Sequence, residues 1–278
     1  MNANDTDTDT ASLSRGQRWL RALAGEPAGD APIWFADAPL YDESARYIAV
    51  VPDPDNRFPR ARDNVVGLEQ GWRLARTVRE VIAADANAPR RRPIVAIVDV
   101  KSQAYGYREE MLGIHLACAA AIDAYASARL AGHPIVALIV GPAMSGAFLA
   151  HGYQANRILA LDAPGTMVHA MGKEAAARVT RRCVEALDAL AESITPMSYS
   201  LTAFGKLGLL DHLIEGVDAD APTEDQIARV RRSVADAVAS ARSGPVDLSR
   251  RLDSDSARAT RAASIEVRMR MAAQWDAV

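Results

Sequence analysis

The stretch GPAMSGAFLAHG, residues 141–152, directly follows the apolar run HPIVALIV. Glycines, a proline and a serine therefore gather where a buried strand is expected to turn into a helix. Phosphate sites, serine nucleophiles and oxyanion holes all use a strand–turn–helix junction of this kind. Each of the three needs different residues around the turn.

A phosphate site is the first possibility, because Gly141 and Gly146 have the spacing of a Walker-type loop. That loop also needs a lysine for the terminal phosphates and a serine or threonine for magnesium. Ala147 and Phe148 occupy those two positions here. The sequence therefore argues against nucleotide hydrolysis.

A serine nucleophile is the second possibility, centred on Ser145. The nucleophile elbow reads G-x-S-x-G, whereas the residues around Ser145 are A-M-S-G-A. His151 follows six residues later, which is about 240° around a helix, so its side chain points away from Ser145. This pattern does not favour a serine hydrolase.

An oxyanion hole is the third possibility. A residue without a Cβ lets the backbone approach a ligand closely, and the first amides of a helix lack partners within it. The amides of Gly146 and Ala147 are candidates to stabilise an enolate or another oxyanion. Ser145 is either a further donor or a helix cap. The alternative is that the turn only packs a helix against a strand.

The chain of 278 residues carries a formal net charge of −3, and 49% of its residues are hydrophobic. This composition supports a sizeable core and gives no basic field for nucleic acid. Apolar stretches reach only about eight residues, which is too short to span a membrane. Residues 1–12 are polar and acidic and are predicted to form a tail rather than a signal peptide. Cys118 and Cys183 lack metal-site spacing, which predicts buried free thiols in helices and a cytoplasmic protein.

Residues 13–278 are predicted to form a single α/β domain with helical N- and C-terminal extensions, because apolar strands alternate with helices. The runs 93–99 and 134–140 are predicted to be neighbouring, buried parallel strands, since a long helix separates them. Helices are predicted over 14–25, from 64 to at least 82, and over 107–132, 145–155, 172–193, 223–244 and 254–275; strands are predicted over 32–37, 46–53, 91–100, 133–140, 156–162 and 166–171.

The order of several motifs resembles the carboxyltransferase branch of the crotonase-like superfamily. The motifs are PIVAIVD, a long helix, HPIVALIVGPAMSGAFLA, NRILALD, MVHAMGKEAA and FGKLGLLDHLIEG, within roughly residues 65–216. The superfamily's turn reads G-x-x-S-G-G-A, whereas this chain reads G-P-A-M-S-G-A and lacks one glycine of the pair. HAMGKEA stands where the superfamily has an S-P-E-G-type turn. The resemblance implies a crotonase-like (ClpP/crotonase) fold with mostly parallel buried strands and covering helices.

One segment narrows the resemblance within this branch. Biotin-dependent carboxyltransferases usually carry Asp-Thr-Pro-Gly where this chain has Asp99-Val100-Lys101-Ser102. With the short length, this departure makes the chain resemble the γ subunits of biotin-independent malonate decarboxylase. That family implies decarboxylation of malonyl-S-acyl-carrier protein to acetyl-S-acyl-carrier protein, together with a β subunit, through an enolate held in an oxyanion hole.

The resemblance also implies cofactor, partners and site. The thioester arm is a phosphoribosyl-dephospho-CoA group on the separate acyl-carrier subunit, and nothing is bound covalently to this chain. The expected partners are the β subunit and the acyl-carrier subunit. The β subunit is expected to dock near residues 141–205, with residues 196–204 as an apolar contact. Without β, the same surface is free to self-associate. The expected site contains no metal. Its candidate catalytic residues are Ser145, Gly146, Ala147 and Gly172, and its candidate substrate-binding residues are Lys101, Tyr105, His151, His169 and Met171.

Three alternatives stay open at this point. The first is a carboxyltransferase subunit of a biotin-dependent carboxylase or decarboxylase. The second is an acyl-CoA hydratase or isomerase, for which Glu174 is the candidate carboxylate, although Glu174 also fits the first turn of a helix. The third is a non-catalytic scaffold that completes the site of its β subunit.

Overall fold

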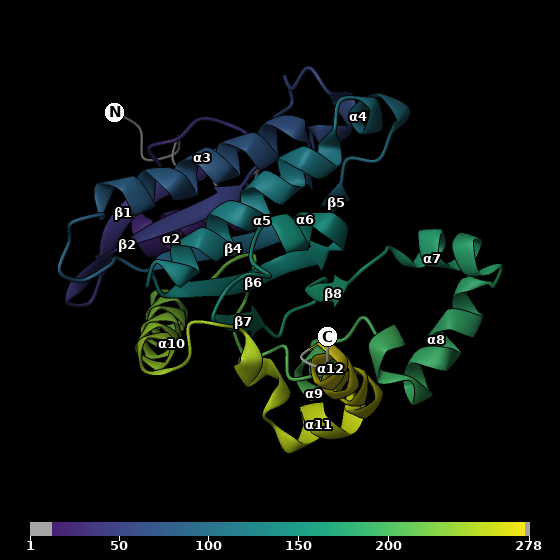
Figure 1. Ribbon diagram of the computed structural model, residues 1–278. Helices are drawn as coiled ribbons and strands as arrows, with labels where there is room; N and C mark the ends of the chain where they lie inside the picture. Colours follow the sequence, from purple (N-terminus) through teal and green to yellow (C-terminus); the bar gives the residue numbers. More distant parts are fainter. Residues whose placement is uncertain (1–12, 276–278) are drawn as a thin grey trace.

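The computed structural model describes residues 13–275 and is built around one mostly parallel sheet (Figure 1). The strand order is β1-β2-β4-β6-β7-β9, and β8 also pairs with β6. Within residues 13–275, β1 and β2 form the antiparallel pair of this sheet, and its other paired strands are parallel. The strands are β1 (Ile33–Leu40), β2 (Glu43–Val50), β4 (Ile94–Val100), β6 (Ile135–Met144), β7 (Arg157–Leu161), β8 (Met167–His169) and β9 (His212–Ile214); β3 (Val65–Val66) and β5 (Ser102–Gln103) form a separate parallel pair. The predicted tail, residues 1–12, lies outside the described residues.

The two central strands confirm the predicted pairing of the apolar runs. β4 and β6 are parallel, with Ile94 opposite Ile135 and Ile97 opposite Leu138. Successive side chains of a strand point to opposite faces of the sheet, so a continuous apolar run has both faces buried. Ile94 and Ile135 accordingly belong to the core on one face, and Ile97 and Leu138 to the core on the other.

Four helices cover these faces. Helices α3 (Leu68–Ala84) and α5 (Ile114–Leu130) pack against each other over one face, and α2 (Arg15–Ala24) and α10 (Glu224–Ser243) cover the other (Figure 1). The other helical elements are η1 (Pro59–Ala61), α4 (Tyr107–Met111), α6 (Ser145–Ala150), α7 (Lys173–Thr180), α8 (Val184–Ser193), η2 (Thr195–Met197), α9 (Leu201–Lys206), η3 (Ser249–Leu252), α11 (Asp255–Thr260) and α12 (Ala262–Trp275).

Several predicted boundaries were wrong. The helix predicted over 107–132 is two helices, because Gly113 adopts a φ of 83°, a left-handed conformation that glycine tolerates. The helix predicted over 172–193 breaks likewise at Arg181, with a φ of 54°. Val65 and Val66 form β3 instead of starting a helix, and the helix predicted over 254–275 is divided at Arg261.

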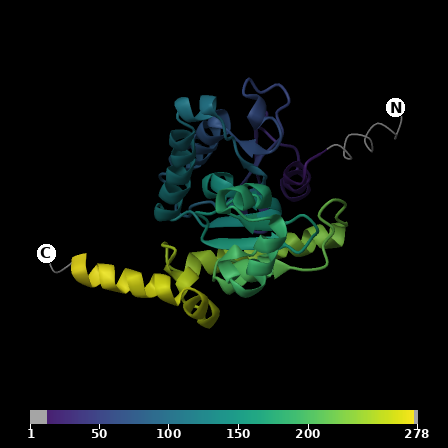
Figure 2. The same cartoon turned by 90° about the vertical axis from the view of Figure 1, so that its right-hand side faces the viewer.

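Two parts of the chain extend from this body. α7 and α8 arch away beyond β8 in Figure 1, and α12 projects outward in Figure 2. The α7–α8 arch has a small core of its own, formed by Ala176, Ala177 and Leu187. Cys183 is exposed at the start of α8, so the prediction of a buried thiol is wrong there, whereas Cys118 is buried as predicted. Over residues 13–275, no helix is both long and apolar enough to cross a bilayer.

Trp19 holds α2 against the sheet, so removing its side chain should destabilise the fold. Its side chain is fully buried and its Nε1–H donates to the Ala219 carbonyl at 3.0 Å. We expect Trp19→Ala to lower the free energy of unfolding by about 3–5 kcal/mol, because it leaves a large cavity. The matched change Trp72→Ala removes a side chain that is 50% exposed and should cost less than about 1 kcal/mol. Denaturant unfolding followed by circular dichroism compares the two; equal losses would contradict this account of α2.

Candidate functional site

The predicted turn lies at the carboxyl edge of the sheet, where parallel α/β sheets commonly bind ligands. β6 ends at Met144 and α6 begins at the next residue, Ser145. β8 pairs with the end of β6, which sets His169 opposite Met144. The turn and His169 therefore meet at one point, although 24 positions separate Ser145 from His169 in the sequence.

Ser145 makes the turn sharp. Its φ is 58°, in the left-handed region that costs a non-glycine residue about 1–3 kcal/mol, and it is 8% exposed. α6 has only six residues, so its dipole is small, and the individual first-turn amides are the available donors. Gly146 supplies one of these amides, and this residue lines a cavity.

Gln103 lies directly over Gly146, a neighbour that the sequence analysis missed. A Cβ built on Gly146 would lie 1.7 Å from Gln103 Oε1, so any side chain at position 146 has to displace Gln103. Gln103 lies in β5, and its nearness to α6 depends on the pairing of β3 with β5. No sequence signal predicts such a contact, because two-residue strands have no periodicity.

The cavity beside the turn has a volume of about 370 Å³ and a mainly apolar lining. None of its lining residues is Lys, Arg, Asp or Glu. Such a lining leaves a bound carboxylate without a cationic partner from the cavity wall. The lining residues are Ser145, Gly146, Phe148, Leu149, Tyr153, Val168, His169, Ala170, Pro196, Met197, Ser198, Phe204, Leu207 and Leu209.

His169 is the one titratable imidazole in this lining. Its ring stacks on Tyr199 with 3.8 Å between ring centroids and 14° between ring planes. Its Nδ1 lies 3.1 Å from the Met171 amide nitrogen and 2.9 Å from the Met171 carbonyl oxygen. Burial lowers the pKa of His169, against an opposing contribution from the Met171 carbonyl, so the ring is mainly neutral at pH 7.

His151 does not reach the cavity, and the prediction that it binds substrate is corrected. It is fully buried; Tyr125 Oη lies 3.0 Å from its Nδ1, and the Ile97 carbonyl lies 2.9 Å from its Nε2. A neutral ring satisfies both contacts when Nε2–H donates to Ile97 and Nδ1 accepts from Tyr125. Burial lowers the pKa of His151 to about 4. His151 is a core residue at the C-terminal end of α6.

The other predicted residues do not line the cavity. Lys101 pairs with Asp63 at 2.7 Å on the surface, and Tyr105 is 52% exposed; neither borders the cavity. Ala147 is buried behind the turn. Gly172 precedes α7 with open space around it, and Met171 packs against the small core of the α7–α8 arch.

Two carboxylates in segments near the site, Asp99 and Glu174, do not border the cavity. Asp99, in the segment that differs from the biotin-dependent enzymes, is buried, and its Oδ2 accepts from the Gly16 amide and from Asn64 Nδ2. Burial raises the pKa of Asp99. It holds α2 against the sheet and does not border the cavity. Glu174 lies exposed in the first turn of α7 and outside the cavity lining. Its position therefore does not support a role as the catalytic carboxylate of a hydratase.

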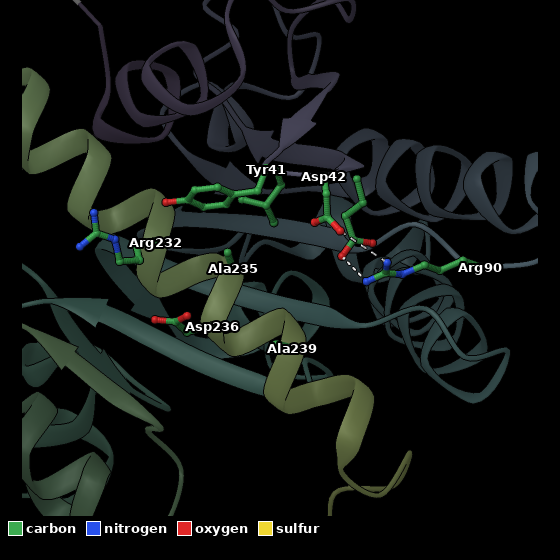
Figure 3. A pocket seen from close by; sticks show the side chains of 9 residues that line it. Tyr41, Asp42, Arg90, Arg232, Ala235, Asp236 and Ala239 are labelled. Atoms are coloured by element: carbon green, nitrogen blue, oxygen red, sulfur yellow. Dashed lines mark hydrogen bonds and ion pairs between the residues drawn. The ribbon is translucent and has the colours of Figure 1, made fainter.

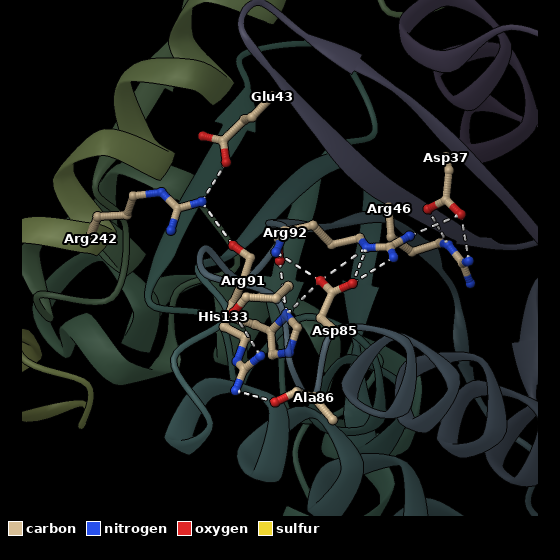
Figure 4. A network of polar contacts seen from close by, with 10 residues as sticks. Asp37, Glu43, Arg46, Asp85, Ala86, Arg91, Arg92, His133 and Arg242 are labelled. Carbon is tan, nitrogen blue, oxygen red and sulfur yellow. Dashed lines mark hydrogen bonds and ion pairs between the residues drawn. The ribbon is translucent and has the colours of Figure 1, made fainter.

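A second cavity, of about 390 Å³, lies at the opposite, amino edge of the sheet (Figure 3). Three of its charged lining residues form ion pairs, since Arg90 contacts Asp42 and Glu43. Beneath it, a polar network surrounds the starts of β2 and β4, where Arg92 bridges Asp85 and Asp37 (Figure 4). Ion pairs hold this edge together, and the lining of its cavity includes charged side chains, unlike the lining beside the turn. Within the described part of the chain, no cluster of three or more potential metal ligands occurs.

A mostly parallel sheet with a small-residue turn over an apolar cavity defines a protein of the crotonase-like carboxyltransferase class. The chain belongs to the family of malonate decarboxylase gamma subunits, whose pattern matches residues 61–275. Both the fold class and the family inferred from the motifs are thereby confirmed.

Three similar proteins illustrate this membership. A chain of a Pseudomonas malonate decarboxylase hetero-tetramer in complex with coenzyme A is 53% identical, with a TM-score of 0.88, covering 94% of this chain and 100% of that chain. A chain of the Pseudomonas malonate decarboxylase MdcD-MdcE hetero-dimer is 52% identical, with a TM-score of 0.85 and the same coverage. The malonyl-S-ACP:biotin-protein carboxyltransferase MADD of Malonomonas rubra is 38% identical over 167 residues, 59% of this chain. The match spans 57% of the length of that relative.

The buried, neutral ring of His151 should make the free energy of unfolding depend on pH. Because its pKa falls from about 6.5 in the unfolded chain to about 4 in the fold, only the unfolded state binds the proton between these values. Stability should therefore fall as pH falls from about 6.5 to 4, with a contribution from His151 of about 3 kcal/mol. His151→Gln should flatten this part of the profile, and the exposed control His115→Gln should leave it unchanged. Unfolding free energies measured at several pH values test this; an unchanged slope in His151→Gln would refute it.

Proposed function

We propose that this chain, paired with a β subunit, decarboxylates malonyl-S-acyl-carrier protein to acetyl-S-acyl-carrier protein. The observation that carries the proposal is the position of Gly146, at a sharp strand-to-helix turn that opens onto an apolar cavity, in a malonate decarboxylase gamma subunit. The solved relatives are malonate decarboxylase assemblies, which supports the same activity and a hetero-oligomer.

The chemistry fits an uncharged cavity. Decarboxylation breaks the bond between the carboxylate carbon and the α-carbon, and the electron pair becomes a thioester enolate while carbon dioxide leaves. The charge moves from the carboxylate to the thioester oxygen, so donors placed at that oxygen lower the barrier. A cationic partner would stabilise the carboxylate of the starting material instead, and the cavity lining has none.

The thioester is carried by a separate acyl-carrier subunit on a phosphoribosyl-dephospho-CoA arm. The coenzyme A held by a solved relative has the same type of pantetheine chain, which supports such an arm. The 370 Å³ cavity suits the acyl end of the arm, and the nucleotide end lies outside it. This chain binds the arm without a covalent bond, in the cytoplasm.

The β subunit docks on the side of the cavity, near residues 141–205. The α7–α8 arch stands off the body there (Figure 1). Val179 and Ile194 are exposed apolar residues of this segment, and Leu149 in the cavity lining is also exposed. A permanent interface of this kind buries more than about 2,000 Å² and is rich in apolar side chains. Without β, the same surface is available for self-association.

A second function is favoured by one relative. The Malonomonas rubra protein is named as a malonyl-S-ACP:biotin-protein carboxyltransferase, in which the carboxyl group passes to biotin. The two functions differ in the fate of the carboxyl group. Malonyl thioester labelled in that group gives free labelled carbon dioxide in a decarboxylase, and label on added biotinylated carrier protein in a transferase.

Gly146→Val tests the turn. The new side chain has to displace Gln103 and pushes the substrate off the amide donors, so we expect decarboxylation to fall by at least about 10²-fold with the fold intact. Gly205→Val is the control, because a Cβ at Gly205 meets no atom closer than 3.9 Å, and its rate should change by only a few-fold. Normal turnover in Gly146→Val, with an unchanged circular dichroism spectrum, would show that the turn only packs.

Reconstitution tests the need for a partner. We expect the isolated chain to be inactive on malonyl thioester, β to copurify with it, and activity to appear on mixing, because one chain supplies one such turn. Crotonyl-CoA should not be hydrated by either preparation. Robust turnover by the isolated chain would contradict the shared site, and hydration of crotonyl-CoA would support the hydratase alternative.

A further inference from the structure

His169 and Tyr199 form a rigid pair at the cavity wall. β8 holds His169 opposite Met144, one residue before the turn, while Tyr199 comes from the connection between η2 and α9. The Val168 amide donates to the Tyr199 carbonyl at 3.3 Å, so backbone and ring contacts join the two segments. The 3.8 Å stacking distance leaves the imidazole little freedom to turn.

The backbone of Met171 contacts Nδ1 of His169 and so influences which ring nitrogen carries a proton. In a neutral ring whose Nδ1 accepts from the Met171 amide, the proton sits on Nε2. In a charged ring, Nδ1–H donates to the Met171 carbonyl, and Nε2 again carries a proton. Tyr199 Oη already donates to that carbonyl at 2.6 Å, which favours the neutral state with Nδ1 as acceptor. A neutral ring with its proton on Nδ1 would donate to the same carbonyl and leave Nε2 bare, and the Tyr199 hydrogen bond to that carbonyl disfavours this tautomer. Nε2–H is therefore the form that the contacts of Met171 and Tyr199 favour.

The Nε2 atom has no hydrogen-bond partner among residues 13–275, while its ring borders the cavity together with Ser145 and Gly146. A neutral imidazole is an effective donor to a developing enolate, because its own charge does not have to change. Nothing else in the cavity lining offers a ring N–H.

We propose that His169 Nε2–H donates a hydrogen bond to the thioester oxygen as it becomes the enolate oxygen, and that Tyr199 is the positioning residue that fixes this ring and its tautomer. The inference rests on the proposed decarboxylation. The proton stays on Nε2 while the enolate forms: the carbon–carbon bond breaks, its electron pair enters the enolate, carbon dioxide leaves, and the oxygen anion is shared between His169 and the amides of the turn. The α-carbon of the enolate then takes a proton from water, which gives the acetyl group.

Variants in the complex with β test both roles. His169→Phe keeps an aromatic ring on Tyr199 but removes the donor, and should lower kcat by about 10²–10³-fold with KM changed only a few-fold. Tyr199→Phe keeps the stacking but removes the hydroxyl, and should lower kcat by about 5–10-fold. The exposed Tyr41→Phe, at the opposite edge of the sheet, is the control and should match wild type.

Coupling and pH separate these roles from a merely structural one. Because Tyr199 acts through His169, the double variant His169→Phe/Tyr199→Phe should be no slower than His169→Phe alone. The wild-type kcat should be flat between about pH 6.5 and 8, since the neutral ring is the donor. Nitrogen NMR of the wild-type complex should show the Nε2–H tautomer, and Tyr199→Phe should shift it toward Nδ1–H.

The results that overturn the proposal are distinct from a failure of the proposed function. If wild-type complex decarboxylates malonyl thioester and a folded His169→Phe stays within about threefold of it, the donor role is wrong. Additive losses in the double variant, or an Nδ1–H tautomer in wild type, would remove the positioning role of Tyr199. A wild-type complex with no decarboxylation at all would refute the proposed function and this inference together.

Discussion

The structure depends on the parallel pairing of β6 with its neighbours on both sides. β6 pairs with β4 along most of its length, its first part also pairs with β7, and its last residues pair with β8, where Met144 meets His169. Because these strands run in one direction, their carboxyl ends share one edge, and the chain must leave that edge through loops and short helices. The turn, the cavity and the α7–α8 arch all follow from this register. A slip of one residue would turn each apolar side chain of β6 to the opposite face.

The same edge places two histidines in different environments. His151 follows α6 inside the core, where both ring nitrogens are paired and burial holds the ring neutral. His169 lies at the cavity wall, with one nitrogen on the backbone of Met171 and the other without a partner among the described residues. Identical side chains thus serve stability in one place and are available for chemistry in the other. The difference comes from which atoms the fold leaves unpaired.

The distribution of charge separates the two edges of the sheet. At the amino edge, Arg92 and its carboxylate partners tie the start of β4 to β1 and to the end of α3 (Figure 4). At the carboxyl edge, the cavity is lined without charged side chains, and Lys101 is held on the surface by Asp63. This arrangement favours decarboxylation, because a nearby cation would stabilise the negative charge on the carboxylate, and that charge has to pass to the thioester oxygen in the transition state. The strained Ser145 lies at this edge as well, supported by the packed β6 strand and α6 helix.

The sequence by itself determined the α/β class, the central strand pair and the small-residue turn, because hydrophobic periodicity and missing side chains are local properties of the chain. It also placed Gly146 and His169 among the candidates. Only the tertiary structure decided that His151 is a core residue, that Lys101 pairs with Asp63, and that Gln103 covers Gly146. The helix breaks at Gly113 and Arg181 were likewise missed, since left-handed residues there leave the flanking helical periodicity intact. Burial and partners are set by segments far apart in sequence, and strand register, which no local pattern encodes, brings those segments together.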